Sequence, residues 1–131
     1  MTRDKIRRIP ELNNRIMRDE AQLRYLKEKA TAVPALSANE KVQTSQTSDR
    51  MKYADAAVDL ELELRVKRDE LKELMEEAGE WIQTLNTPLE RRIFKMRLHK
   101  CFTWEEIAEL IGYSRRRTFQ IVETVLQDKT V

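Results

Sequence analysis

The chain contains few residues of the kinds that form disulfides, metal sites or tight turns. It has one cysteine, Cys101, and one histidine, His99, in 131 residues. A single cysteine excludes an internal disulfide, and two lone ligands are too few for a metal site, so we expect no metal and no cofactor. Two glycines, three prolines and an aromatic content of 6% predict a mostly helical protein with a modest apolar core.

Long apolar runs and catalytic motifs are also missing from the sequence. No run approaches 18 apolar residues and the N-terminus has no signal-peptide pattern, so we expect a soluble intracellular protein without a membrane span. The sequence contains no nucleophile elbow, phosphate-binding loop or histidine-containing triad. We therefore expect no enzyme activity.

The net charge is only +2, but the charged residues are unevenly distributed along the chain. Residues 1–30 contain nine Lys and Arg against five Asp and Glu, and residues 86–131 contain nine against six. Residues 51–85 reverse the balance, with five against ten. Two basic ends favour contact with phosphate or with an acidic partner, whereas the acidic middle is also typical of a solvated helix face.

The first two thirds of the chain show the three-four spacing of apolar residues that is typical of helices packed along a seam. One helix is predicted over about residues 10–30 and a second over about residues 49–85. Residues 31–48 lack this periodicity and are predicted to be a connector. The seam positions are Ile9, Leu12, Ile16, Leu23, Leu26 and Ala30 in the first helix and Ala57, Leu60, Leu64, Leu71, Leu74, Ala78, Trp81 and Leu85 in the second.

The ends and interruptions of these helices are also predicted from single residues. Pro10 fits the first turn of the first helix, and Ser48 or Asp49 fits the cap of the second. One polar residue interrupts each seam, Asp19 in the first helix and Lys67 in the second. The second helix also carries a partial apolar stripe beside its seam. This stripe consists of Val58, Leu62, Met75 and Ile82, and it requires packing against the first helix, against a second copy, or against both.

Residues 87–131 are predicted to form a separate small domain of three helices. The helices are expected over residues 88–100, 103–111 and 114–128. Thr87 and Thr103 are each followed three residues later by Glu, which is the capping-box pattern of a helix start. Gly112 ends the second of these helices, and Ser114 caps the third. A short helix, a glycine turn and a helix with a basic first turn form a helix-turn-helix arrangement.

The start of the third helix carries the side chains that DNA recognition requires. A recognition helix enters the major groove with its N-terminal residues nearest the bases, where Arg binds guanine and Gln binds adenine bidentately. Cations of a preceding helix contact phosphates and make binding sensitive to salt. Three consecutive arginines alone are more typical of a solvated face, but here they follow a turn between two helices. The predicted DNA-binding residues are Ser114, Arg115, Arg116, Arg117 and Gln120, with Arg91, Arg92 and Lys95 in the preceding helix.

The segments LERRIFKMRL and TWEEIAELIGYSRRRTFQIV resemble region four of bacterial sigma factors, the part that reads the promoter −35 element. This resemblance covers about residues 88–127. It implies that Arg115, Arg117 and Gln120 stand at positions where the family places DNA contacts. The principal sigma factors often have an acidic residue where Arg116 stands, and Thr118 and Phe119 also depart from the pattern, so the family's base preference does not carry over.

With its helical N-terminal extension, the whole chain is similar to small phage transcription regulators of the ArpU and RinA kind. This resemblance implies late-gene activation in prophages of Gram-positive bacteria, and hence a location in the cytoplasm of a bacterial host. It does not extend to the helices with which complete sigma factors melt promoters.

Together these observations predict an all-α fold, with a long N-terminal helical hairpin or coiled coil over residues 1–86 and a three-helix helix-turn-helix domain over residues 87–131. We expect a transcriptional regulator that binds double-stranded DNA sequence-specifically. Its long helices would form a homodimer or present a surface to RNA polymerase. Two alternatives stay open, a phage small terminase subunit that packages DNA and a helical adaptor that binds protein only.

Overall fold

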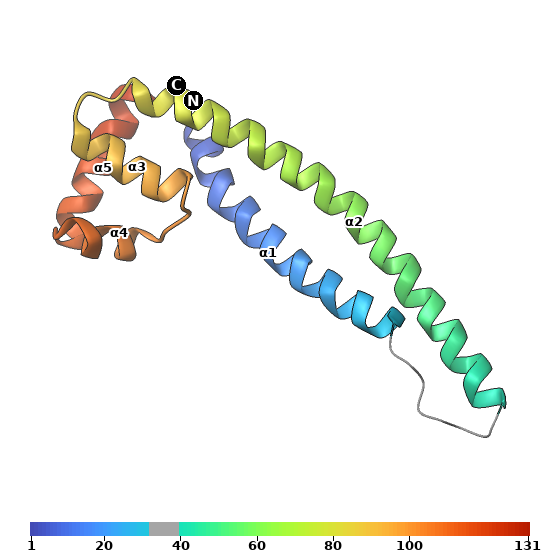
Figure 1. Ribbon diagram of the computed structural model, residues 1–131. Coiled ribbons are helices and arrows are strands. Elements are labelled where there is room, and N and C mark those ends of the chain that lie inside the picture. The colour runs from blue at the N-terminus through green and yellow to red at the C-terminus, as the bar shows by residue number, and fades with distance from the viewer. Residues whose placement is uncertain (32–39) are drawn as a thin grey trace. The chain divides into compact units, whose positions relative to one another are not determined.

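The computed structural model describes residues 1–31 and 40–131, with side chains described through residue 31 and from residue 48 onward. These ranges are all-helical apart from turns and short connections, as predicted. Within these ranges, five helices follow one another (Figure 1). They are α1 (Arg3–Thr31), α2 (Glu40–Gln83), α3 (Pro88–Leu98), α4 (Trp104–Ile111) and α5 (Arg115–Lys129).

Packing divides the chain into two compact units. The larger unit combines Met1–Asn14 with Asp69–Val131, and the hairpin unit is Arg15–Arg68. Both long helices take part in both units, because α1 and α2 each continue across the division. The C-terminal helices therefore share a packing unit with segments that lie before the predicted domain boundary at residue 87.

Helix α1 begins at Arg3, so the prediction that it starts near Pro10 is wrong. Thr2 caps the helix, because the Lys5 amide donates to Thr2 Oγ1 at 3.2 Å and the Ile6 amide donates to the Thr2 carbonyl oxygen at 3.1 Å. Pro10 is an interior residue that cannot donate a backbone hydrogen bond to the Ile6 carbonyl. The added turns bury Ile6 in the core of the larger unit, and this tertiary packing favours the early start.

Helix α2 begins at Glu40, so the predicted connector over residues 31–48 and the predicted caps Ser48 and Asp49 are wrong. The first residues of α2 are mostly polar. They therefore show no apolar periodicity, which is the pattern that reveals a helix in a sequence. Glu, Lys and Gln are nevertheless good helix formers, and a nucleated helix extends through them at little cost. Residues 32–39, which make up most of the rest of the predicted connector, lie outside the described residues.

In the hairpin unit, α1 and α2 run antiparallel and pack along the predicted seams (Figure 1). The buried seam residues of this unit are Ile16, Leu23, Ala57, Leu60 and Leu64. The two polar interruptions meet each other, because Lys67 Nζ donates to Asp19 Oδ2. Only 28% of the Lys67 side chain and 19% of the Asp19 side chain are exposed. The residues that break the two apolar patterns therefore form one ion pair within the seam.

Two further ion pairs join α1 to α2 at the edges of this seam. Arg68 Nη2 lies 3.0 Å from Glu20 Oε1, and Lys27 Nζ lies 2.6 Å from Glu61 Oε1. The hydrogen bond and charge of Lys27 lower the pKa of Glu61. Surface pairs of this kind contribute little to stability, so the packing of the seam dominates.

The partial apolar stripe that was predicted beside the seam of α2 divides between a buried part and an exposed part. Met75 and Ile82 pack in the core of the larger unit, whereas Val58 and Leu62 are 57% and 55% exposed. At 100° per residue, the exposed members lie on the side of α2 opposite the seam. We call this exposed surface the outer stripe, and it consists of Met51, Val58, Leu62 and Val66.

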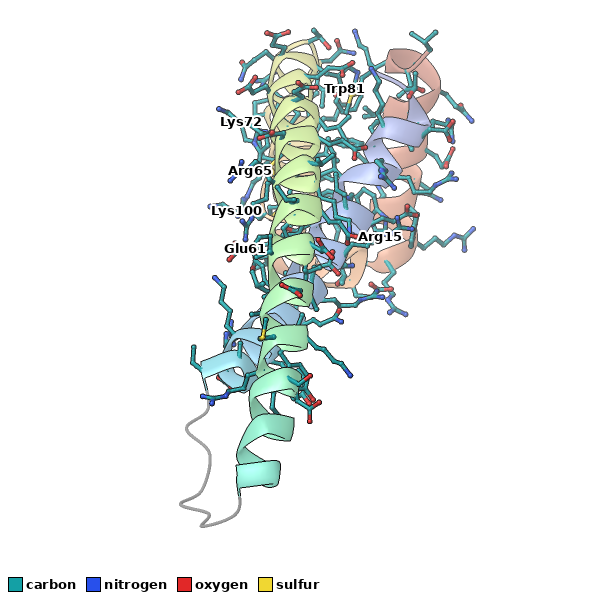
Figure 2. The ribbon with its side chains drawn as sticks, turned by 90° about the vertical axis from the view of Figure 1, so that its right-hand side faces the viewer. Arg15, Glu61, Arg65, Lys72, Trp81 and Lys100 are labelled. Atoms are coloured by element: carbon teal, nitrogen blue, oxygen red, sulfur yellow. The ribbon has the colours of Figure 1, made fainter. Side chains whose placement is uncertain are left out.

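The core of the larger unit collects buried side chains from all five helices. Phe94 lies at its centre with no exposed surface, and its ring meets the rings of Trp81 and Trp104 edge to face, with centroids 5.0 Å and 6.2 Å away. Trp81 lies between α2 and α5 in Figure 2, and its Nε1 donates to the Lys129 carbonyl oxygen at 2.8 Å. The buried residues are Ile6, Ile9, Ala78, Trp81, Ile82, Leu85, Ile93, Phe94, Leu98, Ile107, Val122 and Val125.

Candidate nucleic-acid interface

Gly112 and Ser114 shape the turn between α4 and α5, as predicted. Gly112 has a φ of 77°, a left-handed conformation in which a side chain would be strained, and its amide donates to the Glu109 carbonyl oxygen at 3.3 Å. Ser114 Oγ accepts the Arg117 amide at 3.1 Å and so caps α5. The turn therefore ends α4 and starts α5 within three residues.

The rotation of α5 about its axis is set by three buried residues, Thr118, Val122 and Val125. The Thr118 hydroxyl donates to the Ser114 carbonyl oxygen at 2.9 Å, which satisfies the one polar group buried there. Helical spacing then places Arg116, Gln120, Glu123 and Gln127 along one exposed side, which we call the outer face of α5. The predicted contact residues of this helix are all exposed, namely Ser114, Arg115, Arg116, Arg117 and Gln120.

The three arginines of the first turn of α5 occupy different environments. Arg115 Nη2 lies 2.9 Å from Glu105 Oε1 at the start of α4, and both side chains are more than half exposed. Arg117 Nη1 lies 3.5 Å from Gln120 Oε1, near the limit of a hydrogen bond. Arg116 lies four residues before Gln120 and shares the outer face with it. These cations surround amides at the helix start that have no acceptor within the helix, a combination that favours an anion such as phosphate.

The predicted contact residues of α3 lie on another surface of the larger unit. Arg91 Nη1 donates to the Leu85 carbonyl oxygen at 2.8 Å and so fixes the connection after α2. Arg92 and Lys95 border a hollow of about 450 Å³ along α3 that Lys100 also lines. Figure 2 shows Lys100 on the side of the larger unit away from α5. The structure therefore does not gather the α3 and α5 cations into one surface.

Arg97, a further cation of α3, orients the start of α4. Its guanidinium lies 4.8 Å from the centroid of the Trp104 ring, and its Nη1 donates to the Phe102 carbonyl oxygen at 2.9 Å. Burial lowers the pKa of Arg97. The sequence indicates this role by spacing, because Arg97 lies four residues after Ile93 and three after Phe94. This spacing places Arg97 on the side of α3 that faces the core.

Cys101 lies in the connection between α3 and α4 and has a φ of 56°, which is uncommon for a residue other than glycine. Burial raises the pKa of its thiol, against the opposing charge of Arg97. A raised pKa reduces the thiolate fraction and hence the reactivity of the thiol. Among the described residues, no group of three His, Cys, Asp or Glu side chains is placed to hold a metal ion.

The fold and this surface define an all-α protein with a helix-turn-helix unit whose second helix begins with exposed cations. Comparison with known proteins finds no matching family model, curated protein or solved structure. In the described ranges, none of the helices combines the length and the apolar character that crossing a bilayer requires.

Proposed function

We propose that the chain is a transcriptional regulator that binds double-stranded DNA sequence-specifically and reads promoter or operator bases through the start of α5. The observation that carries this proposal is a capped, exposed and cationic helix start that a buried core holds in a fixed rotation. Arg116 and Gln120 on the outer face are the residues we assign to base reading. Ser114, Arg115, Arg117 and the first amides of α5 would contact phosphates.

The phage or prophage origin and the contact with RNA polymerase are part of the same proposal. Their support is the resemblance of residues 88–127 to sigma region four and of the whole chain to the ArpU and RinA regulators. Arg92 and Lys95 border a hollow that no residue of α5 lines, and this makes the α3 surface the better candidate for the polymerase or another acidic partner.

We expect replacement of Arg116 or Gln120 by Ala to weaken binding to the preferred sequence by about 1–3 kcal/mol, because each side chain forms a bidentate contact with a base. Selection of bound duplexes from a random pool would first define that sequence. Fluorescence anisotropy would then compare the two variants on the selected duplex and on an unrelated duplex, where the expected loss is small.

Gln127→Ala is the matched control. Gln127 lies on the same outer face, but it is almost two helical turns beyond Gln120 and hence further from the helix start. We expect this variant to bind like the wild type. Circular dichroism checks that every variant is folded. If the wild-type chain selects no sequence at about 50 mM salt, where phosphate contacts are strongest, the DNA-binding proposal is wrong.

We further infer that the chain forms a homodimer through the outer stripe of α2. The seam is filled by α1 within one chain, whereas Val58 and Leu62 leave more than half of their surface exposed. A two-fold contact brings the same patch of both copies together, so charges at the edge of the patch favour the contact when both signs are present. At 100° per residue, Asp55 and Arg65 lie beside the outer stripe and supply one charge of each sign.

Replacement of Leu62 by Glu is expected to convert the dimer to a monomer without unfolding it, because the side chain is already exposed. The outer stripe spans only about 22 Å, so we expect a weak dimer that sedimentation velocity detects at micromolar concentration. Leu110→Glu is the matched control, since Leu110 is 54% exposed against 55% for Leu62 but lies in α4. A wild-type monomer at about 100 µM, or a large closed ring, contradicts the dimer, and a ring favours the packaging alternative.

A further inference from the structure

The first turns of α1 lie alongside α5 within the larger unit. The Val131 amide donates to the Met1 carbonyl oxygen at 3.3 Å, and Arg3 Nη2 lies 3.3 Å from Glu123 Oε2. Further along α1, Arg7 lines a groove of about 180 Å³ together with Phe119. The two helices therefore run antiparallel, with the order of contacts leading from the end of α5 toward its cationic start.

Glu123 is an unexpected residue on a surface that approaches DNA. It lies three residues after Gln120 and seven after Arg116, so it shares the outer face with both. A carboxylate there repels phosphate unless a cation compensates its charge. Arg3 supplies that cation through two contacts, with Nη1 to Oε1 at 3.4 Å and Nη2 to Oε2 at 3.3 Å.

Arg7 is an exposed cation in the first turns of α1, close to α5. It lies one turn after Arg3, on the same side of α1 and toward the start of α5. The neighbouring cations point elsewhere, since Lys5 pairs with Glu77 at 2.9 Å and Arg8 pairs with Glu70 at 3.1 Å. Among the side chains of residues 1–31 and 48–131, no carboxylate lies within 4.0 Å of the Arg7 guanidinium.

We propose that the N-terminal turns of α1 form a second part of the DNA-binding surface, in which Arg7 binds a backbone phosphate beside α5 and Arg3 neutralises Glu123. This inference rests on the proposed function and assigns it two residues that lie over a hundred positions from α5 in the sequence. Phosphate contacts of this kind fix the register of a reading helix on the duplex and carry no base information. Because Arg7 is assigned to phosphate binding and Arg3 to the neutralisation of Glu123, we expect different results when each is replaced.

Arg7→Ala is expected to remove one phosphate contact and to reduce the slope of log affinity against log salt by about 0.9. The ratio of wild-type to variant affinity then falls about 3.5-fold between 50 mM and 200 mM salt. The selected duplex and an unrelated duplex should lose affinity equally. Arg24→Ala is the matched control, because Arg24 is an exposed arginine of α1 that belongs to the hairpin unit.

Arg3→Ala is expected to weaken binding several-fold, because it leaves the Glu123 carboxylate uncompensated. The double variant Arg3→Ala with Glu123→Gln should regain most of this loss, which a purely structural role of Arg3 does not predict. The pair is exposed, with 43% and 53% of the side chains accessible, so unfolding midpoints should change little.

The outcomes separate the two proposals. If the wild-type chain binds no duplex at low salt, both the DNA-binding function and this inference fail. If the wild type binds and the Arg7→Ala slope equals that of the wild type and of Arg24→Ala, only the role of Arg7 is overturned. If Glu123→Gln does not restore binding in the Arg3→Ala background, only the role of Arg3 is overturned.

Discussion

Replacement of Phe94 by Ala is expected to lower the free energy of unfolding by about 3–5 kcal/mol. Phe94 has no exposed surface, and its ring contacts both Trp81 and Trp104 edge to face. The substitution removes a large apolar side chain and two aromatic pairs, each worth about 0.5–1.5 kcal/mol beyond burial. Since small domains are stable by about 5–15 kcal/mol, much of the total would be lost.

Urea unfolding followed by tryptophan fluorescence measures this loss of stability. The signal reports on the site of the substitution, because both tryptophans lie against Phe94. The matched control is Phe119→Ala, which makes the same chemical change at a residue that is 46% exposed. We expect that control to cost no more than about 1 kcal/mol. Equal losses at the two positions would show that the core is not organised around Phe94.

Replacement of Asp19 by Leu is expected to lower the free energy of unfolding by about 2–3 kcal/mol, because it leaves the largely buried ammonium of Lys67 without its carboxylate. Replacement of both residues by Leu should regain most of that loss, since the seam then continues as an apolar surface. Chemical denaturation of the two single variants and the double variant forms a double-mutant cycle that measures the coupling.

The adjacent ion pair supplies the control for this cycle. Glu20 and Arg68 join the same helices, but 42% and 53% of their side chains are exposed, so Glu20→Leu should change stability by less than about 1 kcal/mol. The double Leu variant is also expected to lose the unique alignment of α1 on α2, which size-exclusion chromatography detects as higher oligomers. A coupling energy near zero would mean that the seam does not depend on this pair.

The helical fold was predictable because its signals are local. Thr87, Thr103, Gly112 and Ser114 each act within one turn of the chain, and the structure confirms all four as helix caps or stops. Apolar spacing also identified the buried seam, including the interruptions at Asp19 and Lys67. That these interruptions pair with each other did not follow, because the register between two helices is a long-range property.

The start of α1 and the composition of the proposed DNA-binding surface depended on contacts between distant parts of the chain, which no local pattern in the sequence records. Ile6 is buried in a core that the C-terminal helices help to build, and Arg3 meets Glu123 across 120 residues of sequence. Helical spacing does place Arg116 and Gln120 on one face, and that part of the candidate surface was accessible from the sequence. The separation of Arg92 and Lys95 from α5 required the three-dimensional arrangement of α3.

The discontinuity of the larger unit has a consequence for synthesis on the ribosome. Contacts within Arg15–Arg68 form between neighbouring helices, so this segment can fold while the ribosome is still adding residues. Met1–Asn14 must wait for its partners, and at about 5–20 residues per second the 120 residues between Arg3 and Glu123 take roughly 6–24 s to appear. During that interval the core around Ile6 and Ile9 is incomplete on the nascent chain, because its α5 residues Val122 and Val125 are not yet present. The surface that we propose for DNA binding forms only after α5 has left the exit tunnel, because Arg3 and Glu123 both belong to it.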